Sequence, residues 1–150
     1  MPFLPLAAGL SLVALCVVIH AGVIAFLLHR FRQLGMASEI RVLSSTWILV
    51  RIAWWTVLAH LLEIGVWGVA YRVLGILPDL DTALYFSGVT YTTVGYGDVL
   101  IPPPWHTMAV LEGLSGILMA GWSTAFLFAI LNHLFAHARR IVSTPRGGME

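Results

Sequence analysis

The sequence predicts an all-α membrane protein with three transmembrane helices and a short re-entrant helix that is followed by an extended loop. Of its 150 residues, 59% are hydrophobic and only 10% are charged, whereas soluble domains carry about 25% charged residues. Three apolar stretches are each long enough to cross a bilayer, which takes about 20 residues. A fourth segment, at residues 78–104, is too short and too interrupted to cross it twice.

The first apolar stretch runs from Phe3 to about Leu28 and contains no ionisable side chain except Cys16 and His20. No basic residue precedes it, and it exceeds the apolar core of a signal peptide, which is about 7–15 residues long. We therefore expect an uncleaved helix over residues 1–30. A loop is expected over residues 31–45.

The second and third stretches predict helices over residues 46–72 and 106–137, and a short tail is expected over residues 138–150. Carboxylates inside a membrane are costly and are functional or paired by default. His60 and Glu63 are three residues apart, so they can meet on one helix face. We favour structural pairing for Glu63 and for Glu112, and Glu112 is a candidate acceptor for hydrogen bonds from the re-entrant segment.

The re-entrant segment begins with a helix signal. Asp79 or Asp81 can cap a helix N-terminus just after Pro78, which predicts a short helix over residues 81–92. Prolines 102–104 exclude a helix before the third span. Irregular backbone is tolerated at membrane depth only where protein or a water-filled path surrounds it, so this segment needs such surroundings.

Residues 92–98 read Thr-Thr-Val-Gly-Tyr-Gly-Asp and carry the most specific motif of the chain. The two glycines permit backbone angles that other residues adopt only at a cost. Four copies of a Thr-Val-Gly-Tyr-Gly loop can replace the water shell of K⁺ with carbonyl oxygens. The motif predicts a selectivity filter over residues 93–98. The expected K⁺ ligands are the Thr93 hydroxyl and the backbone carbonyls of four residues: Thr93, Val94, Gly95 and Tyr96. Gly97 completes the loop.

These residues resemble the pore of the potassium channel family, specifically the small bacterial channels with two pore-lining helices per subunit. The resemblance covers about residues 46–137 and is densest in Ala-Leu-Tyr-Phe-Ser-Gly-Val-Thr-Tyr (83–91), and it continues in Leu-Glu-Gly-Leu-Ser-Gly (111–116). It implies a potassium channel pore module with an outer helix, a pore helix (81–92) and an inner helix. The first helix is an addition to that module. One chain supplies one loop, so a homotetramer around a central pore is expected.

The resemblance also implies supporting residues. Asp98 would hold the outer end of the filter, and the Tyr85 hydroxyl would donate to it where relatives often place a tryptophan. Thr92, which directly precedes the filter, is expected to support it too. A glycine near Gly116 lets the inner helix bend in the family, and close helix packing is an equal alternative here. Ser123 and Thr124 are candidate residues of the inner cavity.

Arginine positions predict the orientation. By the positive-inside rule, the loop after the first helix and the C-terminal tail are cytoplasmic. The N-terminus and the filter mouth then lie outside, in the plasma (inner) membrane. The arginines that carry this prediction are Arg30, Arg32, Arg41, Arg139, Arg140 and Arg146.

The sequence therefore predicts a potassium-selective channel that conducts passively, with K⁺ as the permeant ion and no cofactor. The alternative is a non-conducting auxiliary or scaffold subunit that retains a filter-like loop. Enzyme motifs and a basic face for nucleic acid are missing. Membrane lipid is an expected partner, and an unidentified regulatory subunit stays open. His133 and His137 alone are too few ligands for a metal site. The sequence assigns no role to these two histidines or to the first helix, and it does not identify the gating stimulus.

Overall fold

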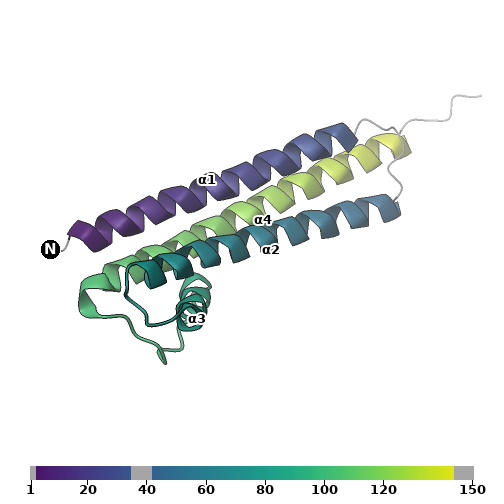
Figure 1. Cartoon of the computed structure of the whole chain (residues 1–150). Coiled ribbons are helices and arrows are strands. Elements are labelled where there is room, and N and C mark those ends of the chain that lie inside the picture. Colours follow the sequence, from purple (N-terminus) through teal and green to yellow (C-terminus); the bar gives the residue numbers. More distant parts are fainter. Residues whose placement is uncertain (1–2, 35–41, 144–150) are drawn as a thin grey trace, which may run out of the picture.

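The computed structural model describes residues 3–34 and 42–143, which are almost entirely helical (Figure 1). The elements are α1 (Phe3–Leu34), α2 (Val42–Val73), α3 (Leu80–Tyr91), a single 3₁₀ turn η1 (Pro103–Trp105) and α4 (His106–Ser143). The three long helices lie side by side, and the short helix α3 lies at one end of them. This confirms the expected all-helical fold, with a short helix between the second and third long ones.

Three stretches are long and apolar enough to cross a membrane: Phe3–Arg30 in α1, Thr46–Val73 in α2, and Pro103–His133, which comprises η1 and most of α4. The helices themselves extend further, since α1 continues past residue 30, α2 begins before residue 46 and α4 continues past residue 137. The expected loop and tail are therefore partly helical. Loss of hydropathy ends a membrane span but not a helix, because arginine is a good helix former. The first helix-breaking residue is Gly35 after the first span and Pro145 after the third.

Asp79 is the residue that caps α3. Its backbone is extended, and its carboxylate accepts hydrogen bonds from the backbone N–H and the hydroxyl of Thr82, both at 2.8 Å. These hydrogen bonds, the backbone one first, hold the pKa of Asp79 below its usual value. Asp81 lies in the first turn instead, where its charge suits the helix dipole. Of the two expected candidates, Asp79 is therefore the cap.

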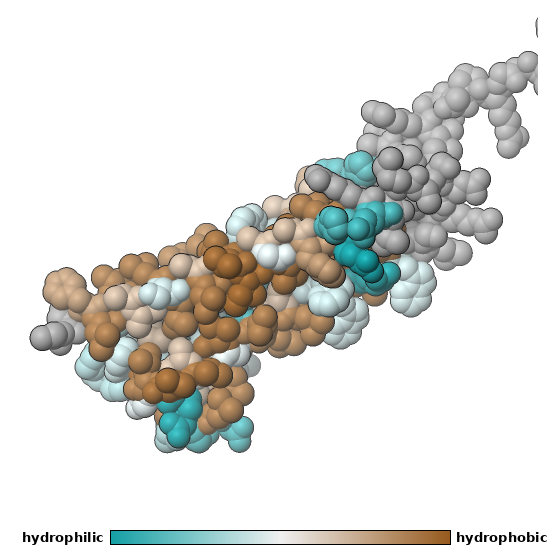
Figure 2. Space-filling view, turned by 45° about the horizontal axis from the view of Figure 1, so that its top comes forward, coloured by the Kyte–Doolittle hydropathy of each residue, from teal (hydrophilic) through white to brown (hydrophobic). Residues whose placement is uncertain are grey.

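Most of the buried apolar side chains lie where α3 packs against the long helices, and they include Trp67, Tyr71, Phe86 and Met108. A smaller cluster joins the three long helices further along. The outward faces carry many exposed apolar side chains, and Figure 2 shows hydrophobic residues along the bundle with hydrophilic ones gathered toward its ends. Such a surface fits contact with lipid or with further protein.

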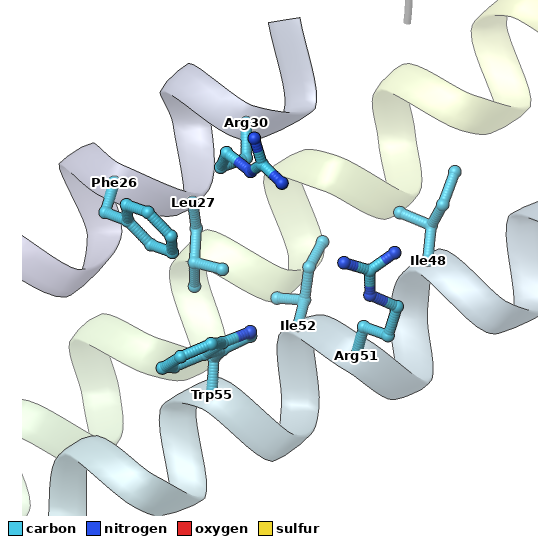
Figure 3. A pocket seen from close by; sticks show the side chains of 7 residues that line it. All are labelled: Phe26, Leu27, Arg30, Ile48, Arg51, Ile52 and Trp55. Atoms are coloured by element: carbon cyan, nitrogen blue, oxygen red, sulfur yellow. The ribbon is translucent and has the colours of Figure 1, made fainter. Parts of the chain in front are cut away.

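A pocket lies between α1 and α2, in the half of the bundle remote from α3 (Figure 3). Arg30 and Arg51 stand at one side of it, and Phe26 and Trp55 meet edge to face at the other, with ring centroids 5.6 Å apart. Long arginine side chains can bury their stems on apolar surface while the charged ends reach water. The two arginines thus mark this half of the bundle as the one near a polar boundary.

Gly116 allows α4 to pass against the end of α3. A Cβ built on Gly116 would overlap the carbonyl oxygen of Tyr91 and lie 2.8 Å from its carbonyl carbon. The backbone of Tyr91 cannot move away without displacing the loop that follows it. Of the two expected roles for Gly116, close packing is thus present in this structure, where α4 runs through Gly116 as one continuous helix.

We predict that Gly116→Ala lowers the free energy of unfolding by about 1–3 kcal/mol, the usual cost of overpacking, because the new methyl group meets backbone rather than a movable side chain. Thermal unfolding in detergent, followed by circular dichroism, measures this. Gly121→Ala is the matched control on the same helix, since a Cβ there meets nothing within 4 Å. Equal unfolding temperatures for the two variants would contradict the packing role.

Candidate functional site

The loop after α3 has an alternating backbone. Thr93, Gly95 and Gly97 have φ angles of 62°, 51° and 76°, whereas Val94 and Tyr96 between them do not have positive φ. Alternation of positive and negative φ angles lines successive peptide groups up on one side of a chain. For a β-branched residue such as Thr93, a left-handed angle is a true outlier. It costs about 1–3 kcal/mol and persists only where the surroundings impose it.

The hydrogen bonds of this loop are made by its donors and not by its carbonyls. The N–H groups of Thr93 and Gly95 donate to Thr90 and Val89 at 3.0 Å, and the Thr92 hydroxyl donates to the Gly88 carbonyl at 2.6 Å. Among residues 3–34 and 42–143, no hydrogen bond ends on a carbonyl oxygen of residues 93–96. The loop is therefore fastened to α3 by one side, and its row of acceptors is left available.

The side chains of the loop are uncovered in the single chain. Val94 is 52% exposed and Tyr96 is 72% exposed, while the residues that flank the loop, Tyr91 and Ile101, are buried. Within the described part of the chain, these two side chains are only partly covered. An apolar loop that is fastened on one side and bare on the other is suited to an interface.

Asp98 and Tyr85 meet at the end of the loop. The Tyr85 hydroxyl on α3 donates to Asp98 Oδ2 at 2.7 Å, which is the contact expected from the sequence. This hydrogen bond holds the pKa of Asp98 below its usual value, because it favours the ionised carboxylate. The contact joins the end of the loop to α3, and its role in supporting a filter stays a prediction.

Glu112 on α4 is fully buried and paired with two other helices. The Tyr71 hydroxyl on α2 donates to one carboxylate oxygen at 2.8 Å, and Ser87 Oγ on α3 lies 2.5 Å from the other. Ser87 Oγ also lies 2.8 Å from the Ile64 carbonyl oxygen. Glu112 is thus a paired carboxylate that accepts from α3, and its influence on the loop remains a prediction.

Glu63 is the centre of a second buried cluster that joins all four helices. Its carboxylate lies 2.9 Å from His20 Nδ1 on α1 and 3.5 Å from His60 Nδ1 on α2, and it also accepts from the Tyr91 hydroxyl on α3. Ser123 Oγ on α4 lies 3.1 Å from Nε2 of each histidine. Ser123 therefore faces helices of its own chain, and its expected place in an inner cavity is wrong.

Sequence reasoning found the pairing of His60 with Glu63 but missed the part that His20 and Ser123 play. His20 is the only polar ring in a long apolar stretch, and Glu63 is a costly buried charge. The presence of both a buried histidine and a buried carboxylate was the available signal. The two residues lie on different helices, however, and no local sequence pattern relates them. Of the two inner-end histidines, the side chain of His137 lies outside the described residues.

Comparison with known proteins adds the family. A model of an ion channel family matches residues 59–133, which is half of the chain. The chain belongs to this ion channel family. No curated protein and no solved structure matches it.

The matched part of this ion channel comprises the half of α2 next to α3, α3 with its loop, and α4 as far as His133. It contains every candidate filter and support residue, as well as Glu63 and Ser123. α1 lies outside the match, so His20 reaches into the family domain from an added helix. Membership confirms that this multi-pass membrane protein is not an enzyme.

We predict that Tyr85→Phe raises the pKa of Asp98 toward its usual value, because the largest cause of the lowered pKa is removed. In the unchanged ion channel the contact is then present at neutral pH and is lost as the pH falls through the pKa of Asp98. Carboxyl-selective ¹³C NMR across acidic pH measures the titration. Asp79, which is bonded to Thr82 instead, is an internal control whose titration stays in place; an unchanged titration of Asp98 would refute the prediction.

Proposed function

We propose that the chain is one subunit of a homotetrameric potassium channel that conducts K⁺ passively through a filter formed by residues 93–97. One observation carries the proposal: the Thr-Val-Gly-Tyr-Gly loop has alternating φ angles, N–H groups fastened to α3 and unpaired carbonyls. Carbonyl oxygens in such rings replace the hydration shell of K⁺. The backbone of Thr93–Tyr96 and the Thr93 hydroxyl supply the oxygens, and ions advance by repulsion between adjacent sites.

The coordination of K⁺ sets the number of subunits that we propose. One chain offers one row of oxygens, and a K⁺ filter of this type needs four rows around an axis. Ion channel domains generally assemble as oligomers. Assembly also supplies what the single chain lacks, since copies would cover the exposed Val94 and Tyr96. We therefore assign α2 as the outer helix, α3 as the pore helix and α4 as the inner helix of each subunit.

The supporting contacts fit this assignment. Asp98 and Tyr85 would hold the outer mouth, Thr92 would tie the filter entrance to α3, and Glu112 would brace α3 against α2 and α4. Arg30 and Arg51 lie in the half of the bundle remote from α3, which supports a filter mouth outside and the arginine-rich ends in the cytoplasm. Gly116 stays a candidate hinge of α4, with its close packing against Tyr91 as the alternative role.

We predict that Gly95→Ala and Gly97→Ala each abolish K⁺ flux while oligomers still form, because a side chain at a left-handed angle costs about 1–2 kcal/mol and displaces the carbonyl row. Purified protein in liposomes loaded with K⁺ and tested against Na⁺ measures flux and selectivity. Gly75→Ala is the matched control, since Gly75 has φ 67° and free space around it but lies outside the filter; it retains selective flux.

Wild-type flux from either filter variant would contradict the assignment of the filter. Wild-type oligomers that pass no K⁺ would favour the alternative, a non-conducting auxiliary subunit. Equal passage of K⁺ and Na⁺ would keep the channel and remove the potassium selectivity.

A further inference from the structure

We propose that His20, His60 and Glu63 form a binding site for a transition-metal ion of the zinc type inside the helical bundle. One ligand atom from each of the three residues lies within 4.8 Å of the others. His20 and Glu63 are 1% and 0% exposed and His60 is 22% exposed, so most of the site is enclosed by the bundle. The proposal goes beyond ion conduction and does not depend on which ion the channel passes.

The distances suit a tetrahedral ion. With metal–ligand distances of about 2.0–2.1 Å, neighbouring ligand atoms are about 3.3 Å apart. The oxygens of Glu63 lie 2.9 Å from His20 Nδ1 and 3.5 Å from His60 Nδ1. Two histidines and one glutamate are a known zinc ligand set. His60 and Glu63 are also one turn apart on α2, a spacing with which helical bundles direct Glu and His ligands to one ion.

Ser123 orients both imidazole rings for this role. Its hydroxyl oxygen has two lone pairs and lies 3.1 Å from Nε2 of His20 and of His60, so it can accept from both N–H groups. Histidines that bind metals usually donate their second ring N–H to such an outer partner. When Ser123 accepts from both rings, the bare Nδ1 atoms of both face the carboxylate of Glu63, and this is the tautomer that a bound cation would select.

A count of hydrogens shows that the cluster without a bound ion lacks one positive charge. Five polar contacts connect the cluster, and each needs one hydrogen. Two neutral imidazoles and the hydroxyls of Tyr91 and Ser123 carry one polar hydrogen each, so they supply four in all. With Glu63 ionised, one contact lacks a hydrogen and the buried cluster carries a negative charge. A cation can supply this positive charge in two ways: one added proton would complete the five contacts, whereas a divalent ion would bind the Nδ1 atoms and the carboxylate in place of hydrogen bonds.

Tyr91 completes the site and connects it to the loop. Its hydroxyl lies 3.0 Å from His60 Nδ1 and donates to Glu63, so it contacts two of the three proposed ligand residues. Tyr91 is also the last residue of α3, directly before the loop at Thr92. A bound ion would therefore fasten α1 to α2 and to the end of α3, which gives the added helix a definite task.

Cobalt spectroscopy tests the proposal on the full chain, purified with an affinity tag that contains no histidine and held in lipid nanodiscs after treatment with a chelator. We expect saturable visible absorption of tetrahedral Co²⁺ at one ion per chain, displaced by Zn²⁺. Glu63→Gln and His20→Gln each abolish it, and Ser123→Ala weakens affinity about 10–100-fold, as for other outer partners. His29→Gln is the matched control on α1, since His29 is exposed and pairs with Gln33; it leaves the absorption unchanged.

Wild-type protein with native helicity that binds no Co²⁺ or Zn²⁺ would overturn the proposal and leave a shared proton as the cation of the cluster. Binding that survives both His20→Gln and Glu63→Gln would also overturn it, because the ion would then sit on other histidines. If one variant fails to fold, the other variant and the titration of the wild-type protein still decide whether the ion binds at this site.

Discussion

The carbonyl oxygens of residues 93–96 impose the constraint on which the rest of the structure depends. A bilayer offers no water to backbone groups, so every exposed carbonyl at membrane depth must find another partner. These oxygens have none among the described residues of their own chain, while the N–H groups on the other side of the loop are bonded to α3. In the proposed tetramer, an ion on the central axis would be the partner that satisfies them all at once.

The buried carboxylates explain how such a loop is held. Taking a carboxylate out of water is expensive unless it is paired and fully hydrogen-bonded. Glu112 joins α2, α3 and α4, and Glu63 joins α1, α2 and α3. Both therefore act on α3, whose last residues set the start of the loop. Polar pairing of this kind fixes one register of the helices, which lipid-like apolar contacts alone do not specify.

Local features were predictable from the sequence because their causes are local. Hydropathy and length gave the three spans, and the spacing from Pro78 left only Asp79 and Asp81 as caps. The Tyr85–Asp98 contact came from the family resemblance, and it too lies within one short segment. The predicted C-terminal ends of α1 and α4 came too early, because hydropathy falls at the arginines before any helix-breaking residue occurs.

The four-helix cluster was not predictable, because nothing in a single sequence relates residues that are 43 or 103 positions apart, as His20 is from Glu63 and from Ser123. The sequence predicted Ser123 as a cavity residue because a small polar side chain on α4 suits a water-filled cavity and a buried hydrogen-bond network equally well. Only the rotation of α4 against α1 and α2 decides between them. That rotation is a property of packing.

The most direct test of the central claim is an electron cryomicroscopy map of the full chain in lipid nanodiscs with K⁺. The account predicts four chains around one axis, with the backbone oxygens of residues 93–96 facing it and ion density between successive rings of oxygens. A map in which these loops lie apart, or turn their carbonyls toward lipid, would contradict it.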